Sequence, residues 1–349
     1  MNLTVHVSKA NALSRAGITN WKSFSDEKGN FKRPRAVLRN SISNKPGSKF
    51  PAERNRYHLY ISYACPWAHR ILIARKLKGL EDIIPFTCVH WLLKDGGWRF
   101  VTAGDDDVEG ENAVPDPLHE GFTHLRQIYY ETDADYQARF SVPVLYDKIQ
   151  KTIVNNESSE ILRMFGTEFN DIIDPKYRDV SLYPEALQSQ IDEVHEWHYD
   201  SINNGVYKCG IASTQEAYER VVTELFEALD KVESHLASAG GPYWFGQSLT
   251  EVDIRLYVTA IRFDPVYVQH FKCNIRDIRS GYPHIHKWLR NLYWNIPAFK
   301  ETTNFHHIKN HYTKSHTPIN PLAITPVGPL PHILPLDKEV AAVEAAAQL

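Results

Sequence analysis

One cysteine lies where an apolar strand is expected to pass into a helix, a position that favours a reactive thiol. Alternating apolar residues over 57–61 predict the strand, and apolar residues at helical spacing over 71–77 predict the helix. Pro66 suits the first helical position, which needs no amide donor. Cys65 would lie beside the positive end of the helix dipole, with Arg70 one turn away. Because both features favour an ionised sulfur, the sequence predicts a reactive cysteine at neutral pH.

The residue three positions after Cys65 limits what its thiol can do. A dithiol reductase carries a second cysteine there, which closes an internal disulfide. This chain has Ala68 instead, so a mixed disulfide on Cys65 must be released by an external thiol, for which glutathione is the abundant intracellular choice. The alternative is a buried, inert cysteine that packs as a small hydrophobe, and the position between strand and helix makes it the weaker interpretation.

Two features downstream suit a peptide-like ligand with an amino-acid end. Pro143 begins a predicted strand, and a cis bond before it would turn the backbone N–H and C=O of Val142 toward such a ligand. Glu157 and Ser158 begin a predicted helix. A hydroxyl and free amides there suit a carboxylate, while the Glu157 carboxylate suits an ammonium. Alone, the pair would indicate only a capped helix; together with Val142, it predicts an amino-acid clamp.

Composition indicates a folded protein and disfavours several partners. The 349 residues are 43% hydrophobic and 12% aromatic, enough for about two domains with real cores. A net charge of -3 without a long basic run provides no footprint for nucleic acid or an anionic membrane. No apolar run approaches the length of a membrane-spanning helix. We expect a cytoplasmic protein, with a mitochondrial location as the alternative, since residues 1–25 are basic and contain no acidic residue.

Neither a disulfide framework nor a metal site is expected. The four scattered cysteines are Cys65, Cys88, Cys209 and Cys273. The spacing of His306, His307 and His311 could suit a metal, but no carboxylate or thiol completes the set. We therefore expect a reducing compartment and no bound metal.

The elements that must position these residues follow the order βαβαββα and then become purely helical. Strands are expected over 57–61, 83–91, 142–146 and 151–154, with helices from Pro66, over 124–130 and from Glu157. An irregular insertion over 94–121 is typical of a lid or binding loop. After a polar connector, helices are expected over 186–204, 214–237, 250–263 and 284–294. Thr250 and Asp253 form the capping box of the third of these.

The chain therefore divides into four parts: an N-terminal extension (1–54), an α/β domain (55–170), an all-α domain (171–317) and a proline-rich tail (318–349). The extension has little periodicity, so we expect an arm that wraps the domains rather than folding alone. Its aromatic residues, Trp21, Phe24 and Phe31, are the candidate anchors.

Several motifs together resemble a known family. Cys-Pro-Trp-Ala at 65–68, Ser-Val-Pro-Val at 141–144 and Asn-Glu-Ser at 156–158 resemble glutathione transferases with a cysteine active site. Longer stretches at 56–60, 152–161, 205–210 and 262–267 are similar to the glutathionyl-hydroquinone reductases, also called Xi-class glutathione transferases. The likeness spans residues 21–328, and as a set the motifs are highly specific.

The resemblance implies a thioredoxin-like N-terminal domain, an all-helical C-terminal domain, a homodimer and a cis bond before Pro143. It implies that Cys65 is the nucleophile. The residues expected to hold glutathione are Trp98, Arg126, Val142, Glu157 and Ser158. Tyr207 and Tyr312 match tyrosines that the family uses around the aromatic substrate, although Thr313 stands where the family often has a second aromatic residue.

The activity that the resemblance implies is reduction of S-glutathionyl-hydroquinones through a mixed disulfide between Cys65 and glutathione. One alternative is an omega-like thioltransferase or dehydroascorbate reductase, which would differ in substrate choice. Another is a non-catalytic interaction module, in which Cys65 would be incidental. The intact cysteine and clamp residues argue against the module.

Overall fold

The computed structural model describes residues 26–31, 33–94 and 96–336. The basic segment 1–25, with the candidate anchors Trp21 and Phe24, lies outside these residues, as does the end of the tail from residue 337. In the described part of the chain, no helix is long and apolar enough to cross a membrane.

A four-stranded mixed sheet forms the centre of the N-terminal domain. Its strands are β1 (Tyr57–Ile61), β2 (Phe86–Cys88), β3 (Val144–Asp147) and β4 (Thr152–Asn155), in the order β2-β1-β3-β4. β1 is parallel to β2 and antiparallel to β3, and β3 is antiparallel to β4. The helices are α2 (Pro66–Leu77), α3 (Arg126–Thr132) and α4 (Ser158–Thr167). This arrangement confirms the predicted order βαβαββα.

The second strand is shorter than the apolar run over 83–91 suggests. The backbone N–H groups of Ile83 and Ile84 both donate to the carbonyl of Leu80, so these two residues close a turn after α2. Their side chains are nevertheless buried. An apolar run without clear alternation does not distinguish a buried turn from a strand, which explains the overprediction.

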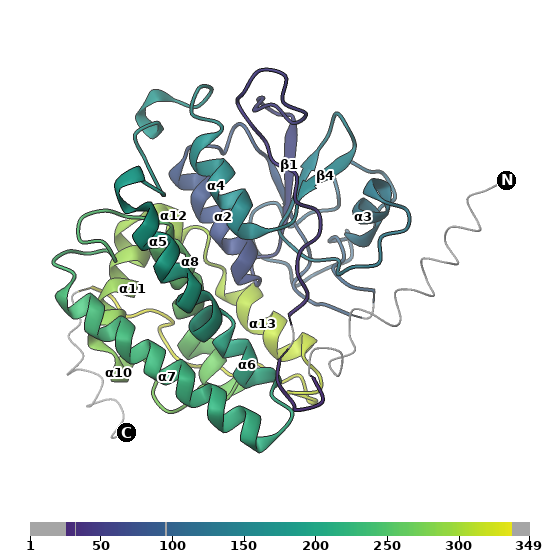
Figure 1. Cartoon of the computed structure of the whole chain (residues 1–349). Coiled ribbons are helices and arrows are strands. Elements are labelled where there is room, and N and C mark those ends of the chain that lie inside the picture. The colour runs from purple at the N-terminus through teal and green to yellow at the C-terminus, as the bar shows by residue number, and fades with distance from the viewer. Residues whose placement is uncertain (1–25, 32, 95, 337–349) are drawn as a thin grey trace.

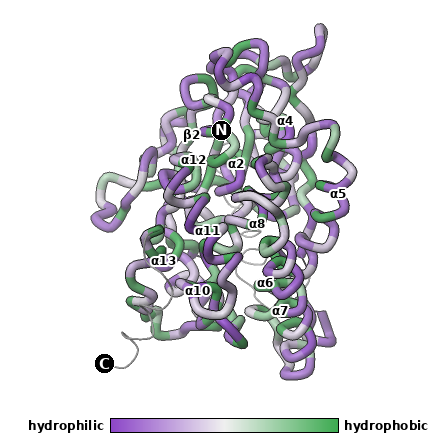
Figure 2. Tube along the Cα trace, turned by 90° about the vertical axis from the view of Figure 1, so that its left-hand side faces the viewer, coloured by the Kyte–Doolittle hydropathy of each residue, from purple (hydrophilic) through white to green (hydrophobic). Residues whose placement is uncertain are grey.

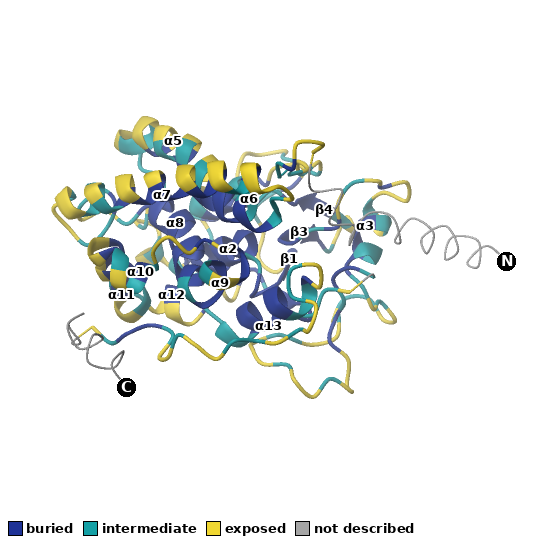
Figure 3. Cartoon of the chain, turned by 90° about the horizontal axis from the view of Figure 1, so that it is seen from below, coloured by how far each residue is buried: buried dark blue, intermediate teal, exposed yellow. Residues whose placement is uncertain are grey.

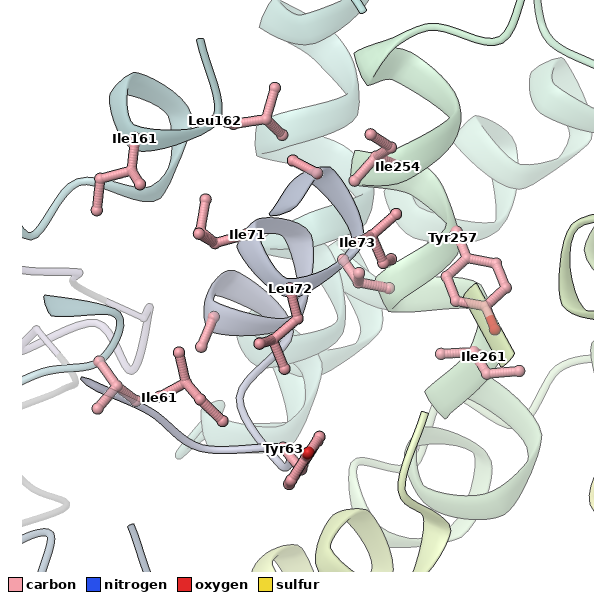
Figure 4. Packing of buried hydrophobic residues seen from close by; sticks show 14 of the residues in the cluster. Ile61, Tyr63, Ile71, Leu72, Ile73, Ile161, Leu162, Ile254, Tyr257 and Ile261 are labelled. Carbon is pink, nitrogen blue, oxygen red and sulfur yellow. The ribbon is translucent and has the colours of Figure 1, made fainter. Parts of the chain in front are cut away.

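Helix α2 lies between the two domains and is buried on every side from Pro66 to Arg75. On one side it packs against α4, and on the other against α8 (Glu251–Arg262). Figure 4 shows Ile71 of α2 directed toward α4, and Ile73 directed toward Ile254 and Tyr257 of α8. Because α2 is buried between elements of both domains, the cysteine that precedes it is held by both.

The C-terminal half consists of helices. In chain order these are α5 (Gln188–Trp197), η4 (His198–Asn203), α6 (Gly205–Ile211), α7 (Gln215–Ser238), α8, η5 (Phe263–Tyr267), α9 (Val268–His270), α10 (Ile278–Gly281), α11 (Pro283–Asn295), α12 (Pro297–Lys300) and α13 (Phe305–Ser315). α5 and α7 present exposed faces, whereas α8 and α2 are buried (Figure 3). Hydrophilic and hydrophobic residues alternate along α7 (Figure 2), as in an amphipathic surface helix. The capping box of Thr250 and Asp253 is present at the start of α8, as predicted.

Two π-helical segments interrupt the expected helices. η4 ends the helix predicted over 186–204, and η5 continues α8 through Pro265. A proline has no N–H to donate, which disfavours regular α-helical bonding at this point. Such segments are frequent at functional sites, and η5 coincides with the motif at 262–267.

The N-terminal arm joins the two domains from outside. The backbone N–H of Ser213, after α6, donates to the carbonyl of Gly29 at 3.3 Å. Further along, Asn40 donates to the carbonyl of Val154 at 2.9 Å, so the arm pairs with the open edge of β4. Figure 1 shows the arm running from beside α6 up to the sheet. The prediction that the arm wraps the domains is confirmed for its described residues.

Candidate active site

Cys65 occupies the N-cap of α2, with Pro66 in the first turn, as the sequence predicts. Its sulfur donates to the backbone carbonyl of Val142, with an Sγ–O distance of 3.5 Å. The Val142–Pro143 bond is cis, as the resemblance implies. Cys65 keeps an intermediate solvent exposure, whereas Ala64 and Ala68 on either side are fully buried. Cys65 therefore lies at the start of a buried helix and is more exposed than the residues on either side of it.

The electrostatic setting of Cys65 differs from the prediction. Burial raises the pKa of its thiol. The backbone N–H groups of Ala68 and Trp67 lower this pKa, as do the charges of Arg262 and Arg33. The net direction is upward with both arginines counted, so burial outweighs the groups that favour the thiolate expected at neutral pH. The two arginines nevertheless favour the ionised form of Cys65.

Arg70 does not supply such a charge. Its guanidinium donates to Oδ1 of Asn203 at 2.9 Å and lies 4.4 Å from the centre of the Trp67 ring. Spacing along a helix places Arg70 one turn from Cys65, but packing directs its side chain toward the helical domain. The prediction that Arg70 assists Cys65 is therefore wrong, and Arg262 and Arg33 take its place.

The candidate clamp residues lie at the start of α4. Glu157 is the N-cap, and its Oε1 accepts from the backbone N–H of Ser159 at 3.1 Å. Ser158 is the first helical residue and is 3% exposed. A capped helix with an acidic N-cap is compatible with the amino-acid clamp, because the remaining carboxylate oxygen of Glu157 can accept from an ammonium group.

A tyrosine hydroxyl connects this helix start to the loop before β3. Oη of Tyr129 donates to the carbonyl of Ser141 at 2.7 Å and accepts from Nδ2 of Asn156 at 3.2 Å. The residues next in sequence to these two are Val142 and Glu157. The buried hydroxyl therefore holds the two halves of the candidate peptide-binding edge together.

Trp98 lies in the insertion, and Arg126 lies just after it and contacts it. Arg126, the first residue of α3, donates from Nη1 to the carbonyl of Gly96 at 3.2 Å. The Trp98 ring is 9% exposed and stacks on His311 of α13, with ring centres 5.0 Å apart. The insertion is therefore folded against the helical domain next to Tyr312.

Three tyrosine hydroxyls form a cluster that reaches Cys65 through Tyr207. The hydroxyl oxygen of Tyr312 lies 2.6 Å from that of Tyr207 and 3.1 Å from that of Tyr267. Burial raises the pKa of Tyr207, and the neighbouring Cys65 raises it further. The structure therefore brings the two predicted tyrosines together next to the thiol. Sequence reasoning did not assign a role to Tyr267, although the motif at 262–267 contains it.

The N-terminal arm also lines this region. Phe31 stacks on Tyr207 with ring centres 6.3 Å apart, and the guanidinium of Arg33 lies 4.1 Å from the centre of the Trp67 ring. The prediction of Phe31 as an anchor is confirmed, while the role of Arg33 had no signal in the sequence.

The histidines of α13 have separate partners. Nδ1 of His311 hydrogen-bonds to the carbonyl of Trp91 at 2.8 Å, and Nε2 of His306 lies 3.0 Å from Oδ1 of Asp107. Within the residues that the structure describes, no group of three or more metal-binding side chains is present. A cavity of about 620 Å³ opens on the outer side of α13 beside Lys309 and does not include Cys65 or the tyrosines.

Comparisons with known proteins agree with this architecture. The family described as "Glutathione S-transferase, N-terminal domain" matches residues 64–168, and "Glutathione S-transferase, C-terminal domain" matches residues 215–291. Glutathione S-transferase omega-like 2 of Schizosaccharomyces pombe is 53% identical over 92% of this chain and 99% of its own. Glutathionyl-hydroquinone reductase YqjG of Escherichia coli is 47% identical, with coverages of 88% and 92%. The Xi glutathione transferase ECM4 of Saccharomyces cerevisiae, solved in complex with glutathione, superposes with a TM-score of 0.83 at 46% identity, over 89% of this chain and 100% of that one.

A thioredoxin-like domain followed by an all-helical domain is the architecture of a glutathione transferase, and here a cysteine stands at the start of α2. The chain belongs to the Xi class of these proteins, the family of the glutathionyl-hydroquinone reductases.

Proposed function

We propose that the protein reduces S-glutathionyl-hydroquinones to hydroquinones, as a glutathione-dependent oxidoreductase whose nucleophile is Cys65. The observation that carries this proposal is the meeting of Cys65, at a helix start and within 3.5 Å of the Val142 carbonyl, with a cluster of tyrosine hydroxyls. The other cysteines, Cys88, Cys209 and Cys273, are buried. Cys65 is thus the thiol that a substrate can reach.

The chemistry has two steps. The Cys65 thiolate attacks the sulfur of the conjugate, and the bond between sulfur and the aromatic carbon breaks. The electron pair of that bond stays on the carbon, which takes up a proton and leaves as the hydroquinone. The thiolate of a second glutathione then attacks the glutathione sulfur of the mixed disulfide, which releases oxidised glutathione and the Cys65 thiolate.

Glutathione would lie along the edge between the cis-proline loop and α4. We assign the backbone of Val142 to its peptide groups, and Glu157 and Ser158 to its amino-acid end. Trp98, from the insertion, and Arg126, from the start of α3, would close the site. These assignments are supported by the common edge that Tyr129 holds together and by the contact of Trp98 with α13.

Tyr207 and Tyr312 would bind the aromatic ring. Their hydroxyls can hydrogen-bond the hydroxyls of the hydroquinone, or donate the proton that the ring carbon needs. Because burial keeps both hydroxyls protonated by raising their pKa, they are suited to donate rather than to abstract a proton.

A homodimer and a cytoplasmic location remain part of this proposal, with a mitochondrial location as the alternative. For the partners, we propose glutathione and glutathionylated aromatic small molecules, without nucleic acid or membrane.

The test compares three substrates with glutathione present: a synthetic glutathionyl-hydroquinone, a glutathione mixed disulfide and dehydroascorbate. Wild type and Cys65→Ser are assayed, and glutathione binding to both is measured by calorimetry. We expect preference for the hydroquinone conjugate, no turnover by Cys65→Ser, and retained glutathione binding. Preference for the other substrates would indicate an omega-like thioltransferase instead. Inactivity on all three would indicate a binding module.

A further inference from the structure

Arg262 reaches across the domain interface to the turn that carries Cys65. It is the last residue of α8 and is fully buried. Nη2 donates to the carbonyl of Tyr63 at 2.8 Å, and Nε donates to the carbonyl of Ala64 at 3.1 Å. A third donor, Nη1, binds the carbonyl of Val258 within α8 at 2.7 Å. One guanidinium therefore ties the two residues before Cys65 to the helical domain.

The remaining partner of Arg262 is an uncharged histidine. Nη1 also donates to Nδ1 of His69 at 3.1 Å, so the proton of that ring is on Nε2, which lies 3.0 Å from Oγ1 of Thr302. Burial, with the charge of Arg262, holds the pKa of His69 well below its usual range. His69 thus orients the guanidinium and does not neutralise it.

The charge of Arg262 has no carboxylate partner among the described residues. None of its hydrogen bonds goes to an acidic side chain, and it takes part in none of the ion pairs found there. A buried cation without a counter-ion is costly. Among the acidic groups beside it, Cys65 has the lowest ordinary pKa, since the others are the tyrosines at 207, 257, 267 and 312.

We propose that Arg262 is a positioning residue for Cys65 and the counter-cation of its thiolate. It fixes the backbone of residues 63 and 64, and its charge favours the ionised sulfur. This inference rests on the proposed role of Cys65 as the nucleophile. It also gives a role to Arg262 as the first residue of the motif at 262–267. The resemblance alone gave this residue no role.

Other charged and titratable groups also lie near Cys65 and affect its ionisation. Arg33 approaches from the N-terminal arm and Arg139 from the segment before β3, while Tyr207 faces the thiol from α6. Arg33 lies over the Trp67 ring and keeps an intermediate exposure, so water screens its charge. Arg262, in contrast, is fully buried and bonded to the Cys65 turn.

The test measures the rate at which iodoacetamide alkylates Cys65 as a function of pH, by peptide mass analysis of the full chain. Arg262→Gln removes the charge and keeps hydrogen-bond donors, whereas Arg262→Lys keeps the charge and loses the planar fork. Arg75→Met is the matched control. Arg75 is also buried and bonded to carbonyls, those of Ile84 and Glu81, but it lies near the opposite end of α2.

We expect Arg262→Gln to be alkylated at least about tenfold more slowly at pH 7, with the midpoint of its profile moved to higher pH. Arg262→Lys should keep a profile within about threefold of wild type and lose turnover through looser positioning. Arg75→Met should lose thermal stability with an unchanged profile.

A folded Arg262→Gln variant with the wild-type profile would overturn the proposal. If that variant does not fold, Arg262→Lys decides, because a profile displaced to high pH in a folded, charged variant would also overturn it. The assay needs no substrate. Failure of the proposed function would instead appear as normal alkylation of Cys65 without hydroquinone turnover, so the two failures are distinguishable.

Discussion

The hydroxyl oxygens of Tyr207 and Tyr312 lie 2.6 Å apart, although 105 positions separate the residues in the sequence. Tyr312 also reaches the hydroxyl of Tyr267, so it is the middle member of a row of three. The row ends beside Cys65 through Tyr207, whose pKa is raised by burial and by that thiol. Proton donation to a leaving aromatic carbon would therefore depend on the middle hydroxyl as well as on the outer ones.

Tyr312→Phe should lower kcat for a glutathionyl-hydroquinone by about 10²-fold, the usual effect of losing a general acid. Alkylation of Cys65 should be unchanged, because the thiol keeps its neighbours. Tyr218→Phe is the control, since its hydroxyl donates to the carbonyl of Lys272 at 2.6 Å outside the row. Unchanged kcat in Tyr312→Phe would contradict a role in proton transfer.

Glu157→Gln should weaken glutathione binding about tenfold or more, as expected for loss of a hydrogen bond to a charged group. The amide still caps α4 through its oxygen, so the helix should be retained. Calorimetric titration measures the change, with Glu168→Gln at the opposite end of α4 as the control. Equal dissociation constants for Glu157→Gln and wild type would remove Glu157 from the clamp.

Gly210→Ala should disturb the aromatic wall of the site. A Cβ atom at Gly210 would lie 2.1 Å from the Phe271 ring, which stacks against Tyr267 and contacts Tyr207. We expect a loss of about 1–3 kcal/mol in the free energy of unfolding, together with lower turnover. Denaturant unfolding and the hydroquinone assay measure the two effects.

The control for this substitution is Gly166→Ala in α4, where nothing lies within 4 Å of the added atom. Alanine is the better helix former, so this variant should gain up to about 1 kcal/mol. Equal stability changes for the two variants would show that the contact with Phe271 does not limit position 210.

Glu251 should matter for stability in a pH-dependent way. Burial raises the pKa of its carboxyl, but hydrogen bonds from His195 and Arg163 and the charge of Arg255 hold the pKa at about 2. Because the pKa of the folded state is below the usual value near 4.5, this stabilisation is complete above about pH 4.5. It is lost as the pH falls toward 2.

Glu251→Gln should cost about 3 kcal/mol at pH 7, because it leaves the buried guanidinium of Arg255 without its carboxylate partner. The cost should shrink at pH 3, where wild type has begun to lose the same charge. Urea unfolding at pH 7, 5 and 3 measures it, and Glu224→Gln in an exposed pair with Arg220 should cost less than about 1 kcal/mol. A cost independent of pH would contradict the ion-pair interpretation.

Local signals in the sequence were sufficient for the elements around the site. Pro66 at the start of α2, the capping box of Thr250 and Asp253, and the start of α4 next to Glu157 all lie where the sequence predicts. Each of these depends on backbone groups within a few residues, so the information is contained in a short segment. The length of β2 was not predicted, because burial alone does not separate a strand from a turn.

The sequence alone determined that Cys65 stands at a helix start without a second thiol, since both properties depend on adjacent residues. Only the tertiary structure decided which charges surround it. Arg70 is near in sequence but turns toward Asn203, whereas Arg262 is distant and reaches the Cys65 turn. The reason is packing: α8 lies against α2, so the direction of a long side chain depends on contacts between helices that no local pattern encodes.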